Sequence, residues 1–362
     1  MYKRQAEEYS TLLHYWLDEI EKGVNSTIVP DPEHTSFLEL SAEDLDGTLS
    51  TFFLNTQLYA GSFININQKR YLELYSVIKD CNVIIGDMED DESETAKTVL
   101  GTAWSLRSIC YYNLLQSFCE PYQSETATET LGLPLVDEFD MEAKPGRSNQ
   151  KETIEFIQKG FRNALSYNVT NKDYLFTAQV TKAYMARFLF WTQDWESAIT
   201  YAKEVLEQYP MLEAEEYSES INQKFSKGKN IIMASYTTED DMGVLNYTSA
   251  QSTVSKRPVC KNLVELLNNT PNDVRKTNAF NAQRIPTKKV TTKFRSEELC
   301  LIIAESYAHL NNTTEALKYL NLLRSKRITQ NYIAYTMDNL PEVFKQTITC
   351  LLYTSPSPRD CS

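Results

Sequence analysis

Apolar residues recur at helical spacing between Arg295 and Arg327 and predict two helices joined by a short polar turn. Steps of three and four residues place these positions on one face of each helix. Residues 311–314 (Asn-Asn-Thr-Thr) interrupt the pattern with side chains that favour turns and helix N-caps. Two alanines, Ala304 and Ala316, stand where the helices would cross. The other positions on this face of the two helices, called the apolar stripe below, are Leu299, Ile303, Ser306, Leu310, Leu320, Leu323 and Arg327.

Residues 177–210 repeat this layout earlier in the chain. Ala186 and Ala198 are twelve residues apart, as the two alanines of the later pair are. A helix pair with this layout resembles a tetratricopeptide hairpin. The glycine usual before the second helix is absent from both copies, which carry Gln193 and Asn311 there. Degenerate copies so far apart predict a helical superhelix in which each hairpin buries its apolar stripe on a neighbour.

The same spacing predicts further helices over residues 6–21, 41–56, 68–85, 95–118 and 153–165. Residues 211–295 change character, with isolated extended runs among Ser, Thr, Asn and Lys. We interpret them as an irregular subdomain inserted between the two hairpins, and long insertions of this kind often carry binding surfaces. The predicted fold class is therefore mostly α, a tetratricopeptide-like superhelix with an irregular inserted subdomain that contains a little β.

Composition and charge narrow the classes of function. An apolar content of 42% in 362 residues is sufficient for a folded core. The net charge of −13, without a cluster of Lys and Arg, argues against a nucleic-acid-binding surface. The chain has no apolar run of the roughly eighteen residues that a membrane-spanning helix needs. Seven cysteines without C-x-x-C spacing do not suggest a disulfide framework.

Catalytic and metal-binding motifs are absent from the sequence. His14, His34 and His309 are scattered, and no glycine-rich phosphate loop occurs. The acidic run 87–94 lacks the alternating ligands and central glycine of a calcium loop. We therefore expect no cofactor, no metal and no enzyme activity. A glycosidase needs only two placed carboxylates and leaves almost no local motif, so a carbohydrate-active enzyme stays an alternative.

Aromatic residues in predicted loops are better candidates for ligand contact than aromatic residues on predicted helix faces. Sugar rings stack their C–H faces on flat side chains, while amides bond the hydroxyl groups. Most of the 22 tyrosines lie on predicted helix faces and are assigned to packing. The competing interpretation is a purely structural role, in which the aromatic side chain only holds its loop in place. The candidate ligand-binding residues are Tyr59, Phe63, Asn65 and Asn67 in a predicted loop at 59–67, and Tyr236, Asn246 and Tyr247 in the insertion.

A series of short motifs runs along the chain. These motifs are Cys81-Asn82-Val83-Ile84-Ile85, Leu106-Arg107 with Tyr111-Tyr112, Gly132-Leu133-Pro134-Leu135, Arg147-Ser148, Arg295-Ser296-Glu297, Ala304-Glu305 and Leu320-Asn321-Leu322-Leu323-Arg324. In this order and at this spacing they resemble the SusD/RagB family of outer-membrane nutrient-binding lipoproteins. The resemblance covers about residues 70 to 345. Arg107, Arg295 and Glu297 match family positions, and their helical setting suggests structural ion pairs.

The resemblance implies a non-catalytic binding protein at the cell surface. Such a protein would bind oligosaccharides, or peptides in the RagB branch, and deliver them to a SusC-like TonB-dependent transporter. It would be held at the outer membrane by an N-terminal lipid anchor that this chain does not contain. A soluble tetratricopeptide adaptor that binds peptides is a further alternative, although the long insertion disfavours it.

We expect one SusD-like domain over residues 6–349. It would comprise an N-terminal helical part (6–210), the insertion (211–295) and the second hairpin (296–327). Residues 1–5 and 350–362 resemble translated sequencing-adapter sequence, and we interpret them as non-native ends.

Overall fold

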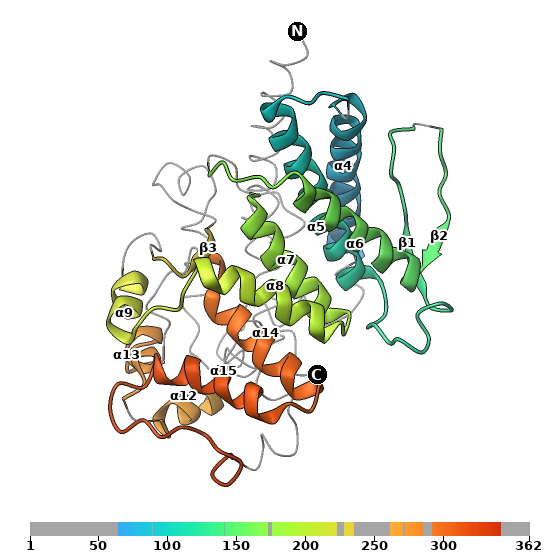
Figure 1. Ribbon diagram of the computed structural model, residues 1–362. Coiled ribbons are helices and arrows are strands. Elements are labelled where there is room, and N and C mark those ends of the chain that lie inside the picture. Colours follow the sequence, from blue (N-terminus) through green and yellow to red (C-terminus); the bar gives the residue numbers. More distant parts are fainter. Residues whose placement is uncertain are drawn as a thin grey trace. The chain divides into compact units, whose positions relative to one another are not determined.

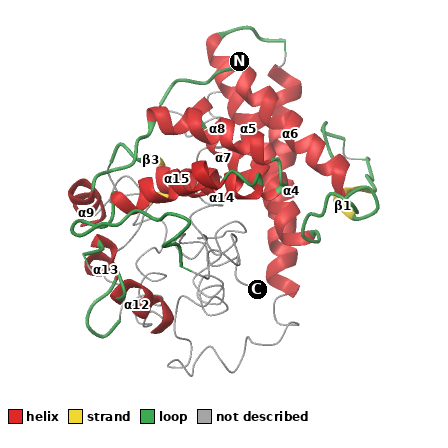
Figure 2. Ribbon diagram, turned by 60° about the horizontal axis from the view of Figure 1, so that its bottom comes forward, coloured by secondary structure: helices red, strands yellow, loops and turns green. Residues whose placement is uncertain are grey.

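The structure is a computed structural model, and helices make up most of the chain that it describes (Figure 2). The expected fold class, mostly α with a little β, is confirmed. The predicted helices at 6–21 and 41–56 and both interpreted non-native ends lie outside the described residues. The described ranges are 64–88, 90–140, 142–172, 176–222, 228–234, 261–270, 272–284 and 292–341.

The chain divides into two compact units between Asp194 and Trp195. The first unit is built on α5 (Glu94–Phe118), which begins at the N-cap Ser93 and packs against α6 (Gln150–Ser166). Gly160 permits this approach, because a Cβ there would lie 2.3 Å from Ser108 Oγ. The other elements of this unit are α4 (Ile64–Met88), β1 (Leu131–Pro134), β2 (Arg147–Asn149) and α7 (Ala178–Trp191) (Figure 1).

The second unit is built on α14 (Ser296–His309), which packs against both α8 (Trp195–Gln208) and α15 (Thr313–Ser325). Ala304 and Ala316, the alanines expected at the helix crossing, are both buried. The insertion adds α9 (Ala214–Asn222), β3 (Ile231–Ala234), α12 (Lys261–Asn268), α13 (Val274–Ala279) and β4 (Thr292–Arg295). β3 pairs antiparallel with β4, which leads directly into α14.

Helix boundaries differ most from the prediction at α4. The loop expected over residues 59–67 ends early, because the helix begins at Ile64. Asn65 and Asn67 favour turns when taken alone. Helix α4 nevertheless extends through them without a break to Met88, so the propensity of the two asparagines did not decide the boundary.

The two hairpin turns adopt the backbone conformation that their missing glycine would favour. Gln193 has φ 63° and Asn311 has φ 58°. In the first turn, Asp194 N donates to Leu189 O at 2.9 Å and Gln193 N donates to Phe190 O at 3.1 Å. The second turn has the same pair of bonds, from Asn312 N to Tyr307 O (2.8 Å) and from Asn311 N to Ala308 O (2.9 Å). Both helices therefore end in a Schellman motif whose left-handed residue is not glycine.

We expect Gln193→Gly to raise the free energy of unfolding by about 0.5–1 kcal/mol, because glycine adopts a positive φ without the Cβ penalty. Asn311→Gly should gain less, since asparagine tolerates this conformation better than glutamine. Urea unfolding followed by circular dichroism measures both changes. Gln158→Gly, inside α6, is the control and should lose about 1 kcal/mol. A Gln193→Gly variant no more stable than the wild type would contradict the expectation.

Candidate functional site

The structure leaves the predicted ligand-binding residues untested. Asn65 and Asn67 lie in the first turn of α4, where only the backbone is described. The other candidates, Tyr59, Phe63, Tyr236, Asn246 and Tyr247, lie outside the described residues. The described residues do show how β3, the strand that precedes Tyr236, and the segment around β1 are held.

In the first unit, side chains of α4 and α5 converge on the backbone that follows β1. All of the side chains belong to the motifs or helix faces singled out in the sequence. They form hydrogen bonds with main-chain groups of residues 134–137. These bonds therefore do not depend on which side chains those residues carry. The contacts are Tyr75 Oη to Pro134 O (2.8 Å), Asn82 Nδ2 to Val136 O (3.0 Å), Arg107 Nη1 to Asp137 O (3.3 Å) and Val136 N to Tyr111 Oη (2.8 Å).

Arg107 is the buried cation of this cluster, with 3% of its surface exposed. Its guanidinium donates to Asn82 Oδ1 at 2.6 Å and lies over the rings of Trp104 (4.1 Å) and Phe156 (5.3 Å). Burial lowers the pKa of Arg107 from its usual value. The expected ion pair does not form within the described residues, where an amide, a carbonyl and two aromatic rings stabilise the charge instead.

The two sides of the β1–β2 hairpin meet at Gly132 and Ser148. Arg147 Nε donates to Gly132 O at 2.7 Å, and Ser148 Oγ donates to Leu133 O at 2.8 Å. Leu133 N in turn donates to Thr153 Oγ1 at 3.0 Å. The Gly-Leu-Pro-Leu and Arg-Ser motifs, fifteen residues apart, are thus two sides of one hydrogen-bonded junction.

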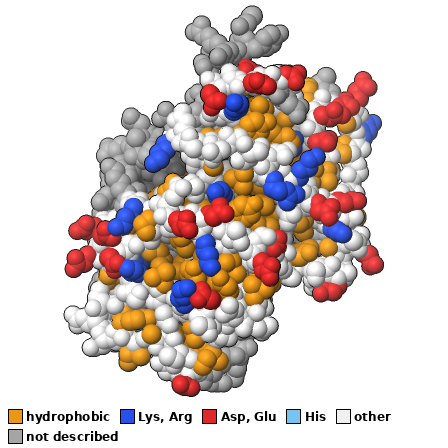
Figure 3. Space-filling model, viewed as in Figure 1, with side chains coloured by type: hydrophobic (Ala, Val, Ile, Leu, Met, Phe, Trp, Pro, Cys, Tyr) orange, Lys and Arg blue, Asp and Glu red, His pale blue; other side chains and the backbone are white. Residues whose placement is uncertain are grey.

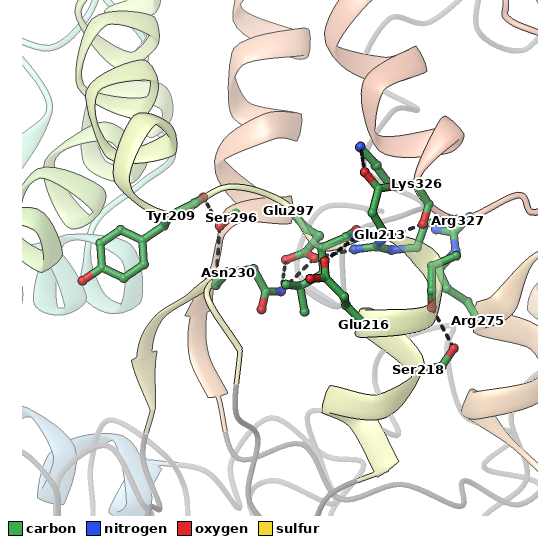
Figure 4. Close-up of polar contacts among 12 residues, drawn as sticks. Tyr209, Glu213, Glu216, Ser218, Asn230, Arg275, Ser296, Glu297, Lys326 and Arg327 are labelled. Carbon is green, nitrogen blue, oxygen red and sulfur yellow. Dashed lines mark hydrogen bonds and ion pairs between the residues drawn. The ribbon is translucent and has the colours of Figure 1, made fainter.

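A buried ionic network holds the insertion of the second unit (Figure 4). The side chain of Arg327 is 1% exposed and pairs with Glu297 at the start of α14. Its Nη1 donates to Leu212 O at 3.0 Å, and its guanidinium lies 3.9 Å from the centre of the Tyr217 ring. Asn230 Nδ2 donates to both carboxylate oxygens of Glu297, at 2.9 and 3.1 Å.

This network connects the first part of the insertion to α14, the helix that follows the insertion. Leu212 precedes α9, Tyr217 lies in α9, and Asn230 immediately precedes β3. Burial lowers the pKa of Arg327, and the Glu297 carboxylate opposes that shift. The segment that carries Tyr236 therefore leaves from a strand whose start is anchored to α14 through Glu297.

The sequence pattern contained a signal for Arg327 that the prediction did not use. Arg327 follows Leu323 by four residues on the apolar stripe, so a charged residue stood at a core position. A cation at such a position requires a buried partner. Glu297, expected in a structural ion pair, does form one, and its partner is Arg327.

Two other features bear on what the described part of the chain can bind. It contains no group of three or more His, Cys, Asp or Glu side chains placed to hold a metal ion. None of its helices combines the length and the hydrophobicity required to cross a bilayer.

The comparison with known families assigns part of the chain to a family. Residues 46–190 match the model of the SusD-like family that is described as starch-binding and associating with the outer membrane. Residues 46–190 of this chain are SusD-like in sequence. No curated protein matches the sequence.

Solved structures share the fold of this chain. A SusD superfamily protein from Bacteroides thetaiotaomicron superposes with a TM-score of 0.78 at 18% identity, over 97% of this chain and 84% of the other. A SusD-like carbohydrate-binding protein from Bacteroides vulgatus has a TM-score of 0.71 at 18% identity, with 95% and 79% covered. A third structure, named as a putative sugar-binding protein from the same species, has a TM-score of 0.68 at 18% identity, with 91% and 81% covered.

Proposed function

We propose that this SusD-like protein binds oligosaccharides at the cell surface and delivers them to a SusC-like TonB-dependent transporter of the outer membrane, without cleaving them. The match of residues 46–190 to a family described as starch-binding and outer-membrane-associated carries the proposal. Structures of the same fold are named as carbohydrate- or sugar-binding proteins, which supports a glycan as the ligand. A lipid at the N-terminus of the mature protein would provide the membrane attachment.

The proposed ligand contacts are the loop aromatics and their neighbouring amides. Aromatic faces would stack on sugar rings, and amide groups would bond hydroxyls. On the face drawn in Figure 3, acidic and basic side chains are interspersed, and acidic ones gather toward the β1–β2 hairpin at the upper right. Such a surface favours a neutral ligand over a polyanion. The proposed residues are Tyr59, Phe63, Asn65, Asn67, Tyr236, Asn246 and Tyr247.

Binding to an array of glycans and peptides tests the ligand class. A response to oligosaccharides alone would support the proposal, whereas a response to peptides alone would favour the RagB-type alternative. Incubation of each bound oligosaccharide with the protein, followed by chromatography, tests the absence of cleavage. Appearance of shorter products would favour the carbohydrate-active enzyme instead. Co-purification of the transporter with the tagged, membrane-anchored protein tests the delivery step, and a transporter that never co-purifies would overturn it.

Calorimetry with an oligosaccharide selected on the array tests the residues. We expect Tyr59→Ala and Tyr247→Ala each to weaken binding roughly threefold to tenfold, because an aromatic contact contributes about 0.5–1.5 kcal/mol. Phe139→Ala is the matched control, since this aromatic side chain is 49% exposed on the hairpin and is not a proposed contact. Unchanged affinity in both tyrosine variants would remove these residues from the site.

A further inference from the structure

We infer that a hollow in the first unit is a sugar-binding subsite, lined by residues other than the proposed loop aromatics. It lies between the end of α5 and the base of the β1–β2 hairpin and has a volume of about 600 Å³. This is within the range of roughly 300–1,000 Å³ that small-molecule sites occupy. The inference rests on the proposed glycan-binding function and assigns part of it to a defined place. The lining includes Phe118, Glu120, Gln123, Glu129, Leu131 and Arg147.

Hydrogen bonds fix the walls of the hollow before any ligand arrives. The first residue of α6, Gln150, donates from Nε2 to Glu120 O at 2.7 Å and from its backbone N to Thr130 O at 2.8 Å. Lys151 N donates to Ala127 O at 3.0 Å. The turn from residue 120 to 130 is thus fastened to the N-terminus of α6 at three points. A rim held in this way loses little conformational entropy when it binds.

Three polar side chains on the rim are available to a ligand. Glu120, Gln123 and Glu129 are exposed, and none of them has a side-chain hydrogen bond or ion pair with another residue that the structure describes. Carboxylates accept hydrogen bonds, whereas an amide both donates and accepts. Neighbouring hydroxyls of a sugar need this mixture of acceptors and donors.

The hollow also offers an apolar contact and a cation. Leu131 is 57% exposed and Phe118 is half-buried, so the C–H face of a sugar ring can cover apolar surface there. Arg147 contributes the guanidinium, and its Nε is already engaged by Gly132 O. With two carboxylates against one guanidinium, the lining favours a neutral polyol over a phosphorylated or sulfated ligand.

Alkylation of Cys119 provides a direct measure of occupancy. Cys119 lines the hollow and is partly exposed, whereas Cys81, Cys110 and Cys300 are buried. Burial raises the pKa of the Cys119 thiol and Arg147 opposes that shift, so the reaction with N-ethylmaleimide should be run at mildly alkaline pH. Peptide mass spectrometry then measures the rate at which Cys119 alone is modified, with and without maltoheptaose, xylohexaose or mannohexaose.

We expect at least one of the three sugars to slow alkylation of Cys119 about tenfold when present at about ten times its Kd, because only the unoccupied fraction reacts. Glu129→Ala and Gln123→Ala should each weaken binding of that sugar by roughly threefold to tenfold, the loss of one hydrogen bond. Glu138→Ala is the matched control, because this exposed carboxylate lies on the hairpin and does not line the hollow. Its affinity should equal that of the wild type.

Two outcomes would overturn the inference and separate it from the proposed function. If calorimetry shows that a sugar binds while Cys119 is not protected and Glu129→Ala behaves like Glu138→Ala, the hollow is not a subsite but glycan binding stands. If no sugar binds and the glycan array is blank, both the hollow and the proposed function fail.

Discussion

Arg327→Ala is expected to destabilise the second unit by about 3–5 kcal/mol, since removing one partner of a buried ion pair leaves the other charge unpaired. The Glu297 carboxylate would lose the guanidinium, and Leu212 O and the Tyr217 ring would lose their contact with it. The insertion would then separate from α14 before the helices themselves unfold. Urea unfolding and hydrogen exchange at α9 and β3 measure the change.

The surface pair Lys318–Glu315 provides the control for Arg327. Its lysine side chain is 62% exposed, so Lys318→Ala should cost less than about 1 kcal/mol. The double variant Arg327→Met/Glu297→Met should recover part of the loss, because it removes the stranded charge as well. Equal effects of Arg327→Ala and Lys318→Ala would show that the buried network does not stabilise this unit.

Gly132→Ala is expected to cost about 3 kcal/mol, the upper part of the usual range for overpacking. A Cβ at this position would lie 2.2 Å from Thr153 Oγ1 and 2.3 Å from Asn149 O. The backbone oxygen belongs to the N-cap of α6 and cannot rotate away. Displacing Thr153 instead would break its bonds to Leu133 N and Ser148 Oγ.

Gly146→Ala tests whether the clash, and not the loss of a glycine, causes this effect. Gly146 lies just before β2, and a Cβ there would meet nothing within 4 Å. Its variant should remain within about 0.5 kcal/mol of the wild type. Thermal unfolding of both variants, with hydrogen exchange at Leu133, separates the two cases. A Gly132→Ala variant as stable as Gly146→Ala would contradict the close approach.

The sequence predicted those parts of the fold in which local spacing determines structure. Helices α5 and α14 follow directly from apolar residues at steps of three and four, and the two hairpin turns follow from interruptions of that spacing. The strands have only three or four residues, too few for a period of two to be recognised. Their partners are also distant in sequence, as Ile231 and Arg295 are, so only tertiary contacts determine the pairing.

The candidate sites differ in how far sequence could predict them. Loop aromatics can be selected by residue type, but Tyr59 and Tyr247 lie outside the described residues and stay predictions. The hollow beside Glu129 could not be anticipated, because its polar side chains follow no periodic pattern and become neighbours only when Gln150 binds the turn. Pairing of Glu297 with Arg327 depended likewise on a contact across 30 residues.

The hydrogen bonds from Tyr75, Asn82 and Arg107 to residues 134–137 affect which substitutions this protein can tolerate. These three side chains donate to carbonyl oxygens, which every amino acid possesses. Substitutions in residues 134–137 that still fit the space can thus alter the side chains presented to solvent, while α4 and α5 continue to hold the backbone in the same place. New surface properties can arise there without rebuilding the scaffold beneath.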